Sequence, residues 1–103
     1  MSSYRVEIEI LGLKPGHRPP EVMDAAVAAI GLANTVESRD LDIAAGTPRI
    51  LIRFAVSPAS RDEEDEDARG AAFDGCRGVE EVATIGRSWL LRRDGGRWTP
   101  VRF

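Results

Sequence analysis

The stretch RVEIEILGLKPGHRPPEVMDAAVAAI, residues 5–30, decides the fold, because its pattern changes from a strand period to a helix period. From Arg5 to Ile10 charged and apolar side chains alternate, which predicts a half-buried strand. Residues 12–20 are rich in Gly and Pro and predict a loop. Pro19 and Pro20 suit a first helical turn, and the apolar residues after them have helical spacing. We therefore predict a helix from about Pro20 to Ile30.

Residues 35–56, TVESRDLDIAAGTPRILIRFAV, predict two strands joined at AAGTP. In the first of them, Val36 and Leu41 lie on opposite faces of a regular strand, so we expect a bulge between them. The second strand is regular, and one of its faces carries Ile50, Ile52, Phe54 and Val56.

A second helix is predicted after Ser60, which forms a Ser-x-x-Glu capping box with Glu63. Its apolar stripe consists of Ala68, Ala72, Phe73 and Cys76. Residues 62–67 read DEEDED, and like charges repel one another. We expect the acidic segment 60–68 to be a mobile, solvated helix start.

The last sixteen residues, SWLLRRDGGRWTPVRF, predict a hairpin. Trp89 and Leu91 share one face of its first strand, so we expect the core or a subunit interface to cover them. A turn at residues 95–96 pairs Asp94 with Arg97 and avoids opposing two arginines. Two interpretations remain open: an anion-binding edge with an aromatic neighbour, or a hairpin that completes the fold, which we favour. The residues of this candidate interaction hairpin are Trp89, Arg92, Arg93, Arg97 and Trp98.

The order of elements predicts one α+β domain over residues 1–103. It is a ferredoxin-like βαββαβ sandwich, an antiparallel sheet with two helices on one face, and an extra C-terminal strand forms a hairpin. The pairs Pro15-Gly16 and Gly78-Val79 stand where ACT domains, which are small ligand-binding domains, have such pairs. Residues 5–90 thus resemble an ACT domain, although HRPP after Gly16 and the final hairpin depart from that pattern. The resemblance implies the same fold and a candidate ligand-binding loop of Gly16, His17 and Arg18.

Composition excludes several classes of function. The formal net charge of −3 argues against a nucleic-acid binder. The longest apolar run, Ala25–Ala33, is too short to span a bilayer, and the first ten residues do not form a secretory signal. The single cysteine, Cys76, permits no intramolecular disulfide and indicates a cytoplasmic protein. We expect this thiol to be buried and inert.

The sequence assigns no catalytic residue, metal or cofactor. His17 is the only histidine, so no His-His or Cys-His metal cluster can form, and DEEDED lacks the spacing of an EF-hand loop. His17 beside Glu21 is the one candidate general base, but a histidine in a Pro-rich loop is more often simply exposed.

These observations predict a non-enzymatic binding or protein-interaction module that forms a homodimer through a sheet edge or the uncovered sheet face. Leu51, Leu90 and Trp98 are expected to make that face partly apolar. One alternative is a small enzyme of the dimeric α/β-barrel type with an apolar pocket on the open sheet face. Another is an acidic protein that binds a basic protein partner through residues 62–67.

Overall fold

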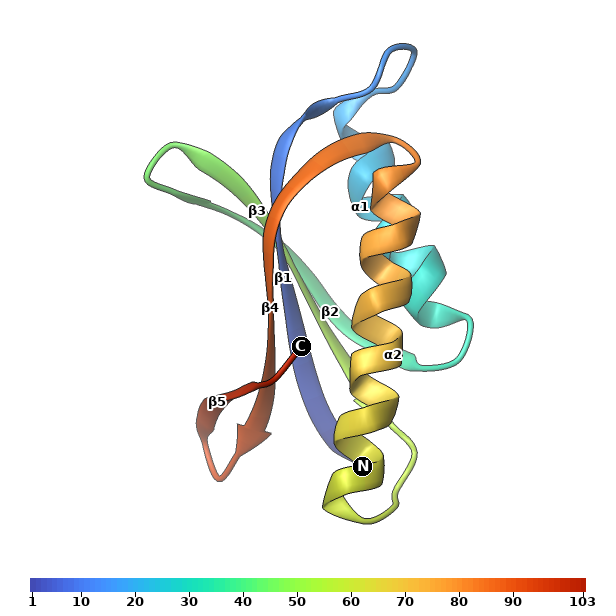
Figure 1. Cartoon of the computed structure of the whole chain (residues 1–103), viewed down its shortest axis with the longest axis vertical. Helices are drawn as coiled ribbons and strands as arrows, with labels where there is room; N and C mark the ends of the chain where they lie inside the picture. The colour runs from blue at the N-terminus through green and yellow to red at the C-terminus, as the bar shows by residue number, and fades with distance from the viewer.

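The computed structural model describes residues 1–103 except for the side chain of Ala44. It contains a single five-stranded antiparallel sheet with the strand order β2-β3-β1-β4-β5 and two helices on one face of that sheet (Figure 1). This architecture confirms the predicted α+β class and is compatible with a ferredoxin-like fold. The elements are β1 (Ser2–Leu13), α1 (Pro19–Gly31), β2 (Thr35–Ala44), β3 (Thr47–Val56), α2 (Arg61–Glu80), β4 (Ala83–Asp94) and β5 (Arg97–Val101).

The core lies between the sheet and the two helices. Alternate residues of β1 and β3 are buried, as their sequence period predicts. The helices approach each other closely at glycines of α2, because a Cβ on Gly78 would lie only 2.9 Å from the Cβ of Ala29. The largest fully buried side chains are Tyr4, Val6, Ile8, Ile30, Ile52, Phe54, Val56, Val79 and Leu90.

Three local predictions are confirmed. Gly95 and Gly96 both have positive φ and form the last turn, with Asp94 opposite Arg97 and Arg93 opposite Trp98. The pairing of β2 with β3 shifts register between residues 36 and 38, which is the expected bulge. Ser60 is the N-cap of α2, and its hydroxyl accepts a hydrogen bond from the backbone N–H of Glu63.

The predicted faces of β4 are wrong. Leu90 pairs with Val6 and is 2% exposed in the core, whereas Trp89 and Leu91 lie on the open face of the sheet. The cause is a register shift against β1: Ile8 pairs with Ser88, but Ile10 pairs with Ile85. The extra residue of β4 at this bulge inverts the alternation, so a pattern counted from Ile85 places the later residues on the wrong face.

The predicted stripe of α2 is correct except at one residue. Ala68, Ala72 and Cys76 are buried at a spacing of four, but Phe73 is 55% exposed. Neighbouring helical residues point about 100° apart, so Phe73 turns away from the line that its neighbour Ala72 occupies.

Candidate functional site

The sheet extends past the start of α1, and this difference in length leaves apolar side chains without cover. β2 and β3 each have ten residues and are about 33 Å long at strand rise, whereas the thirteen residues of α1 span only about 20 Å. Figure 1 shows the turn end of the β2–β3 hairpin projecting away from both helices. We call residues 41–48 of this hairpin the arm.

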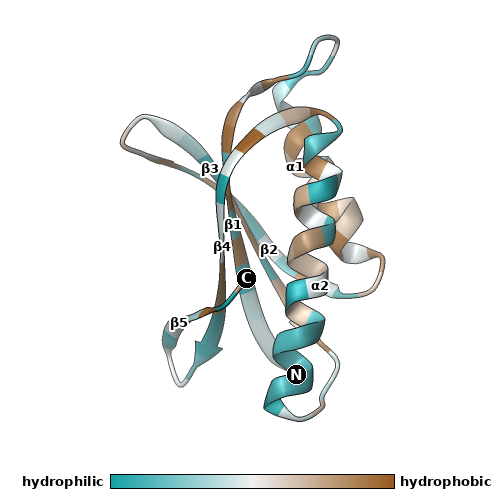
Figure 2. Ribbon diagram, viewed as in Figure 1, coloured by the Kyte–Doolittle hydropathy of each residue, from teal (hydrophilic) through white to brown (hydrophobic). Residues whose placement is uncertain are grey.

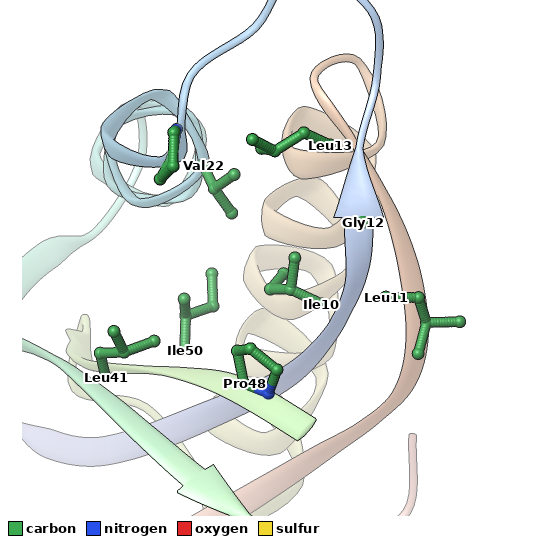
Figure 3. A pocket seen from close by; sticks show the side chains of 9 residues that line it. Ile10, Leu11, Gly12, Leu13, Val22, Leu41, Pro48 and Ile50 are labelled. Atoms are coloured by element: carbon green, nitrogen blue, oxygen red, sulfur yellow. The ribbon is translucent and has the colours of Figure 1, made fainter. Parts of the chain in front are cut away.

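A groove opens between the arm, the end of β1 and the start of α1. Its volume is about 340 Å³. Figure 3 shows Leu41, Pro48 and Ile50 on one wall, with Val22 and Leu13 across from them. We call this the hairpin groove. The residues that line it are Ile10, Leu11, Gly12, Leu13, Pro19, Val22, Leu41, Pro48 and Ile50. None of these nine has a polar side chain.

Exposed apolar residues concentrate around the hairpin groove. Leu13 and Leu41 line it and are 41% and 60% exposed. Leu11 points away from it (Figure 3) and is 61% exposed, and Ile43 on the arm is 63% exposed. Figure 2 shows the end of β1 as strongly hydrophobic and the first turns of α2 as hydrophilic. This end of the molecule therefore presents apolar side chains to the outside.

The predicted ligand-binding loop lies beside this groove, between Leu13 and Pro19, which both line it. Lys14 to His17 form a turn closed by a backbone hydrogen bond of 3.2 Å, and Gly16 has the positive φ that such a turn requires. The structure thus gives Gly16 a backbone role.

Side chains at the start of α1 cap the helix. Nδ1 of His17 lies 3.2 Å from a carboxylate oxygen of Glu21, whose other oxygen accepts the backbone N–H of Arg18. The bond from Arg18, followed by the one from His17, lowers the pKa of Glu21. His17, the candidate general base, does contact Glu21, but this contact belongs to the hydrogen-bond network that caps the helix.

The open face of the sheet is covered by its own arginine and tryptophan side chains. The guanidinium carbons of Arg5, Arg53 and Arg93 lie 4.7, 5.4 and 5.1 Å from the ring centre of Trp98. Those of Arg49 and Arg87 lie 4.1 and 5.5 Å from the ring centre of Trp89.

Glu7 lies beneath this layer and neutralises part of its charge. Its carboxylate forms ion pairs with Arg5 at 2.7 Å and with Arg49 at 3.2 Å, and the residue is only 9% exposed. Leu51 and Trp98 do lie on this face, as expected, but Leu90 does not. The face is a layer of contacts within one chain rather than a bare apolar surface.

Arg92 does not join the other residues of the predicted interaction hairpin. Its side chain points to the helix side and is 9% exposed. It forms ion pairs with Glu64 at 2.9 Å and Asp65 at 3.1 Å, and Asp65 accepts a hydrogen bond from Tyr4 at 2.5 Å. Burial, followed by the bond to Asp65, raises the pKa of Tyr4.

The same cluster anchors the acidic start of α2. Residues 62–67 are helical, and within them Glu64 is 6% exposed. Its hydrogen bonds from Ser2 and Arg92 lower the pKa of this carboxyl group. Asp94 accepts bonds from Arg61 at 2.8 Å and Thr99 at 2.6 Å, which lower its pKa to about 2. Arg97, by contrast, is exposed at the turn.

Cys76 is buried, and burial raises the pKa of its thiol. Within the described part of the chain, no three His, Cys, Asp or Glu side chains are grouped so that they could hold a metal ion. No helix among the described residues is long and apolar enough to cross a membrane.

No protein-family model, curated protein or solved structure shows significant similarity to this chain.

Sequence reasoning did not find the hairpin groove. Leu41 and Ile43 alternate with Asp40 and Asp42, and such a pattern is the same whether a helix covers the strand or not. The usable signal was the comparison of lengths, because two ten-residue strands outrun the helix of about eleven residues predicted from the sequence.

Proposed function

We propose that this chain is a non-enzymatic protein-interaction module on a ferredoxin-like scaffold, and that it self-associates through the end of the molecule that carries the hairpin groove. The scaffold assignment is supported by the position of the strands. β3 lies between β1 and β2, and β1 lies between β3 and β4, which is the split arrangement expected of two interleaved βαβ units. The single buried cysteine supports a cytoplasmic location.

One observation carries the proposal. Eight large hydrophobic residues are exposed among those that the structure describes, and four of them, Leu11, Leu13, Leu41 and Ile43, lie at this one end. Clustered apolar exposure on a small domain indicates an interaction site, whereas single exposed residues do not. All the side chains that line the groove are apolar, which favours a protein surface over a small molecule, because small-molecule sites carry a few polar side chains that orient the ligand.

Sedimentation velocity at tens of micromolar tests this proposal. The unaltered chain is expected to sediment as a dimer and the double variant Leu41→Asp/Ile43→Asp as a monomer, because two carboxylates would be desolvated in the contact. Leu32→Asp is the matched control, since Leu32 is 89% exposed beyond the end of α1 and lies outside the groove. A monomeric unaltered chain, or a double variant that still dimerises, would contradict the proposal.

A further inference from the structure

The outer edge of β4 is covered over only part of its length. β4 has twelve residues, but β5 pairs only with residues 90–94 of it. After Val101 the chain leaves the sheet, and Nε of Arg69 on α2 donates a hydrogen bond of 2.7 Å to the backbone carbonyl of Arg102. Within the described part of the chain, no strand pairs with the outer side of residues 83–89. We call residues 83–89 the free edge.

The backbone groups of Ser88 point out of the free edge. In a hairpin with a two-residue turn, the pair next to the turn, here Asp94 and Arg97, exchanges both backbone hydrogen bonds. Antiparallel strands alternate such residues with residues whose backbone groups point to the other side. Every second residue of β4 from Asp94 to Ser88 therefore turns its backbone groups away from β1. The same alternation places Pro100, which has no N–H, where no hydrogen bond to β4 is made.

The end of β5 leaves a step beside the free edge. Neighbouring strands lie about 4.8 Å apart, so the free edge is set back from the outer edge of β5 by that distance. Figure 1 shows β5 beside only the last part of β4. A hollow of about 230 Å³ at the step is lined in part by Ser88, Trp89 and Phe103. The free edge is about 23 Å long at strand rise, which is room for one extended chain in line with β5.

Phe73 of α2 borders the free edge on the helix side of the sheet. Gly75 and Gly78 of α2 face α1, because a Cβ on either would lie 2.9 Å from an α1 side chain. At about 100° per residue, Phe73 lies on the opposite side of α2, toward β4. Arg69, one turn earlier on that side, reaches the residues that follow β5. Phe73 is 55% exposed and offers an added strand an apolar contact.

Arg87 borders the free edge on the open side of the sheet. It is exposed, and its guanidinium carbon lies 5.5 Å from the ring centre of Trp89. The carboxylate of Glu9 accepts the backbone N–H of Arg87 at 2.8 Å. None of the ion pairs among the described residues involves the guanidinium group of Arg87. This group is therefore available to a carboxylate of a partner.

The other edge of the sheet is protected by charge. Residues 39–42 of β2 include Arg39, Asp40 and Asp42, and charged side chains are a common means by which edge strands avoid pairing. The free edge of β4 has one charged residue, Arg87. It is therefore the edge that is suited to accept a further strand.

We propose that the free edge binds an extended peptide of a partner protein, which adds to the sheet as a strand in line with β5. The peptide bonds to the backbone N–H and carbonyl of Ser88, places an apolar side chain against Phe73 and places an acidic side chain beside Arg87. The bulge of β4 begins after Ser88 and limits regular pairing, so the two side-chain contacts supply part of the affinity. This surface is separate from the hairpin groove, and the proposal does not depend on self-association.

A synthetic seven-residue peptide in which valine and aspartate alternate tests the backbone contact. In NMR spectra of the full chain, we expect the amide signal of Ser88 to shift saturably, with a dissociation constant below about 1 mM. Ser88→Pro removes the outward N–H, which an edge strand tolerates, and is expected to weaken binding by about tenfold or more. Ser88→Ala is the matched control, because it loses the same hydroxyl and keeps the N–H; its binding is expected to stay within about twofold.

Modified peptides test strand addition without any change to the chain. Two versions carry N-methyl groups on alternate residues, one set on each edge of the peptide. An added strand bonds through one edge only, so we expect one version to bind as the parent does and the other to bind about tenfold more weakly or less. Equal binding of the two versions, or no binding of the parent peptide at about 1 mM, would overturn the proposal.

Charge reversal tests the side-chain contact. Arg87→Glu is expected to bind a valine–lysine peptide about fivefold more tightly than the valine–aspartate peptide, the reverse of the unaltered chain. Arg97→Glu makes the same charge change at the exposed turn and is expected to keep the original preference. An unchanged preference in Arg87→Glu would overturn the assigned orientation of the peptide. If Ser88→Pro abolishes self-association of the chain, a second copy occupies the free edge and the proposal is overturned.

Discussion

The two hairpins of this protein differ in how far the chain itself satisfies their side chains. The β4–β5 hairpin contains both tryptophans and several arginines, and almost every one of them is engaged within the molecule: Trp98 by three guanidinium groups, Arg92 by two carboxylates and Asp94 by Arg61 and Thr99. The β2–β3 hairpin has a plainer composition, yet its arm leaves Leu41 and Ile43 more than half exposed.

The comparison shows that the type of a residue does not decide whether its side chain is free to contact a partner. Trp and Arg are frequent in protein interfaces, but here they form contacts that close the fold. Leu and Ile usually belong to cores, but on the arm the helix that would cover them is too short. The candidate binding surface is therefore the part of the sheet that no helix of the chain covers, and not the hairpin that contains the tryptophans.

The largest expected effect concerns Arg92. Arg92→Met would leave Glu64 and Asp65 near the buried hydroxyl of Tyr4 without a counter-charge, and we expect it to lower the free energy of unfolding by about 3 kcal/mol. Arg97→Met is the control at an exposed position of the same hairpin, with an expected change within about 0.5 kcal/mol. Urea unfolding of both variants measures the difference. Equal small losses would show that the β4–β5 hairpin is not closed by its own contacts.

A smaller effect is expected at Trp98. Trp98→Ala removes the ring on which Arg5, Arg53 and Arg93 pack, and we expect a loss of about 1–2 kcal/mol in unfolding free energy with no change in sedimentation. Leu41→Asp is expected to change the sedimentation, by dissociating the dimer, with little change in the unfolding free energy of the monomer. Dissociation of a dimer by Trp98→Ala would move the interface to the open face.

The smallest effect is the acid dependence that Asp94 contributes. Its pKa is about 2 in the folded chain, below the ordinary value of 3.8, because Arg61 and Thr99 bond to the ionised form. Because the pKa of Asp94 is lower in the folded chain than in the unfolded chain, this carboxyl group stabilises the folded state at pH values above its ordinary pKa. That stabilisation is lost as the pH falls from about 4 to about 2. Asp94→Asn should flatten that part of the stability profile in urea unfolding at several pH values. An unchanged profile would show that Asp94 does not contribute to the acid dependence of stability.

The sequence predicted those parts of the fold that depend on local chemistry. The alternation of β1 and β3, the cap at Ser60 and the turn at Gly95-Gly96 follow from side-chain period and turn residues, and all are confirmed. The faces of β4 could not be predicted, because one extra residue between Ser88 and Ile85 depends on the pairing with β1.

The candidate sites depend more on tertiary structure. The burial of Arg92 follows from that same bulge, which turns it toward α2 and the carboxylates of Glu64 and Asp65. The hairpin groove depends on the relative placement of β1, α1 and the arm, elements that no local pattern arranges in space.

The most direct test of the central claim is hydrogen–deuterium exchange of the unaltered chain at about 1 µM and about 100 µM. We expect amides of residues 11–13 and 41–48 to exchange more slowly at the higher concentration, because a second copy then covers the hairpin groove. Amides of residues 87–98, which carry both tryptophans, are expected to exchange equally at both concentrations. Slower exchange over residues 87–98 with no change over 41–48 would contradict the claim and place the interface on the open sheet face.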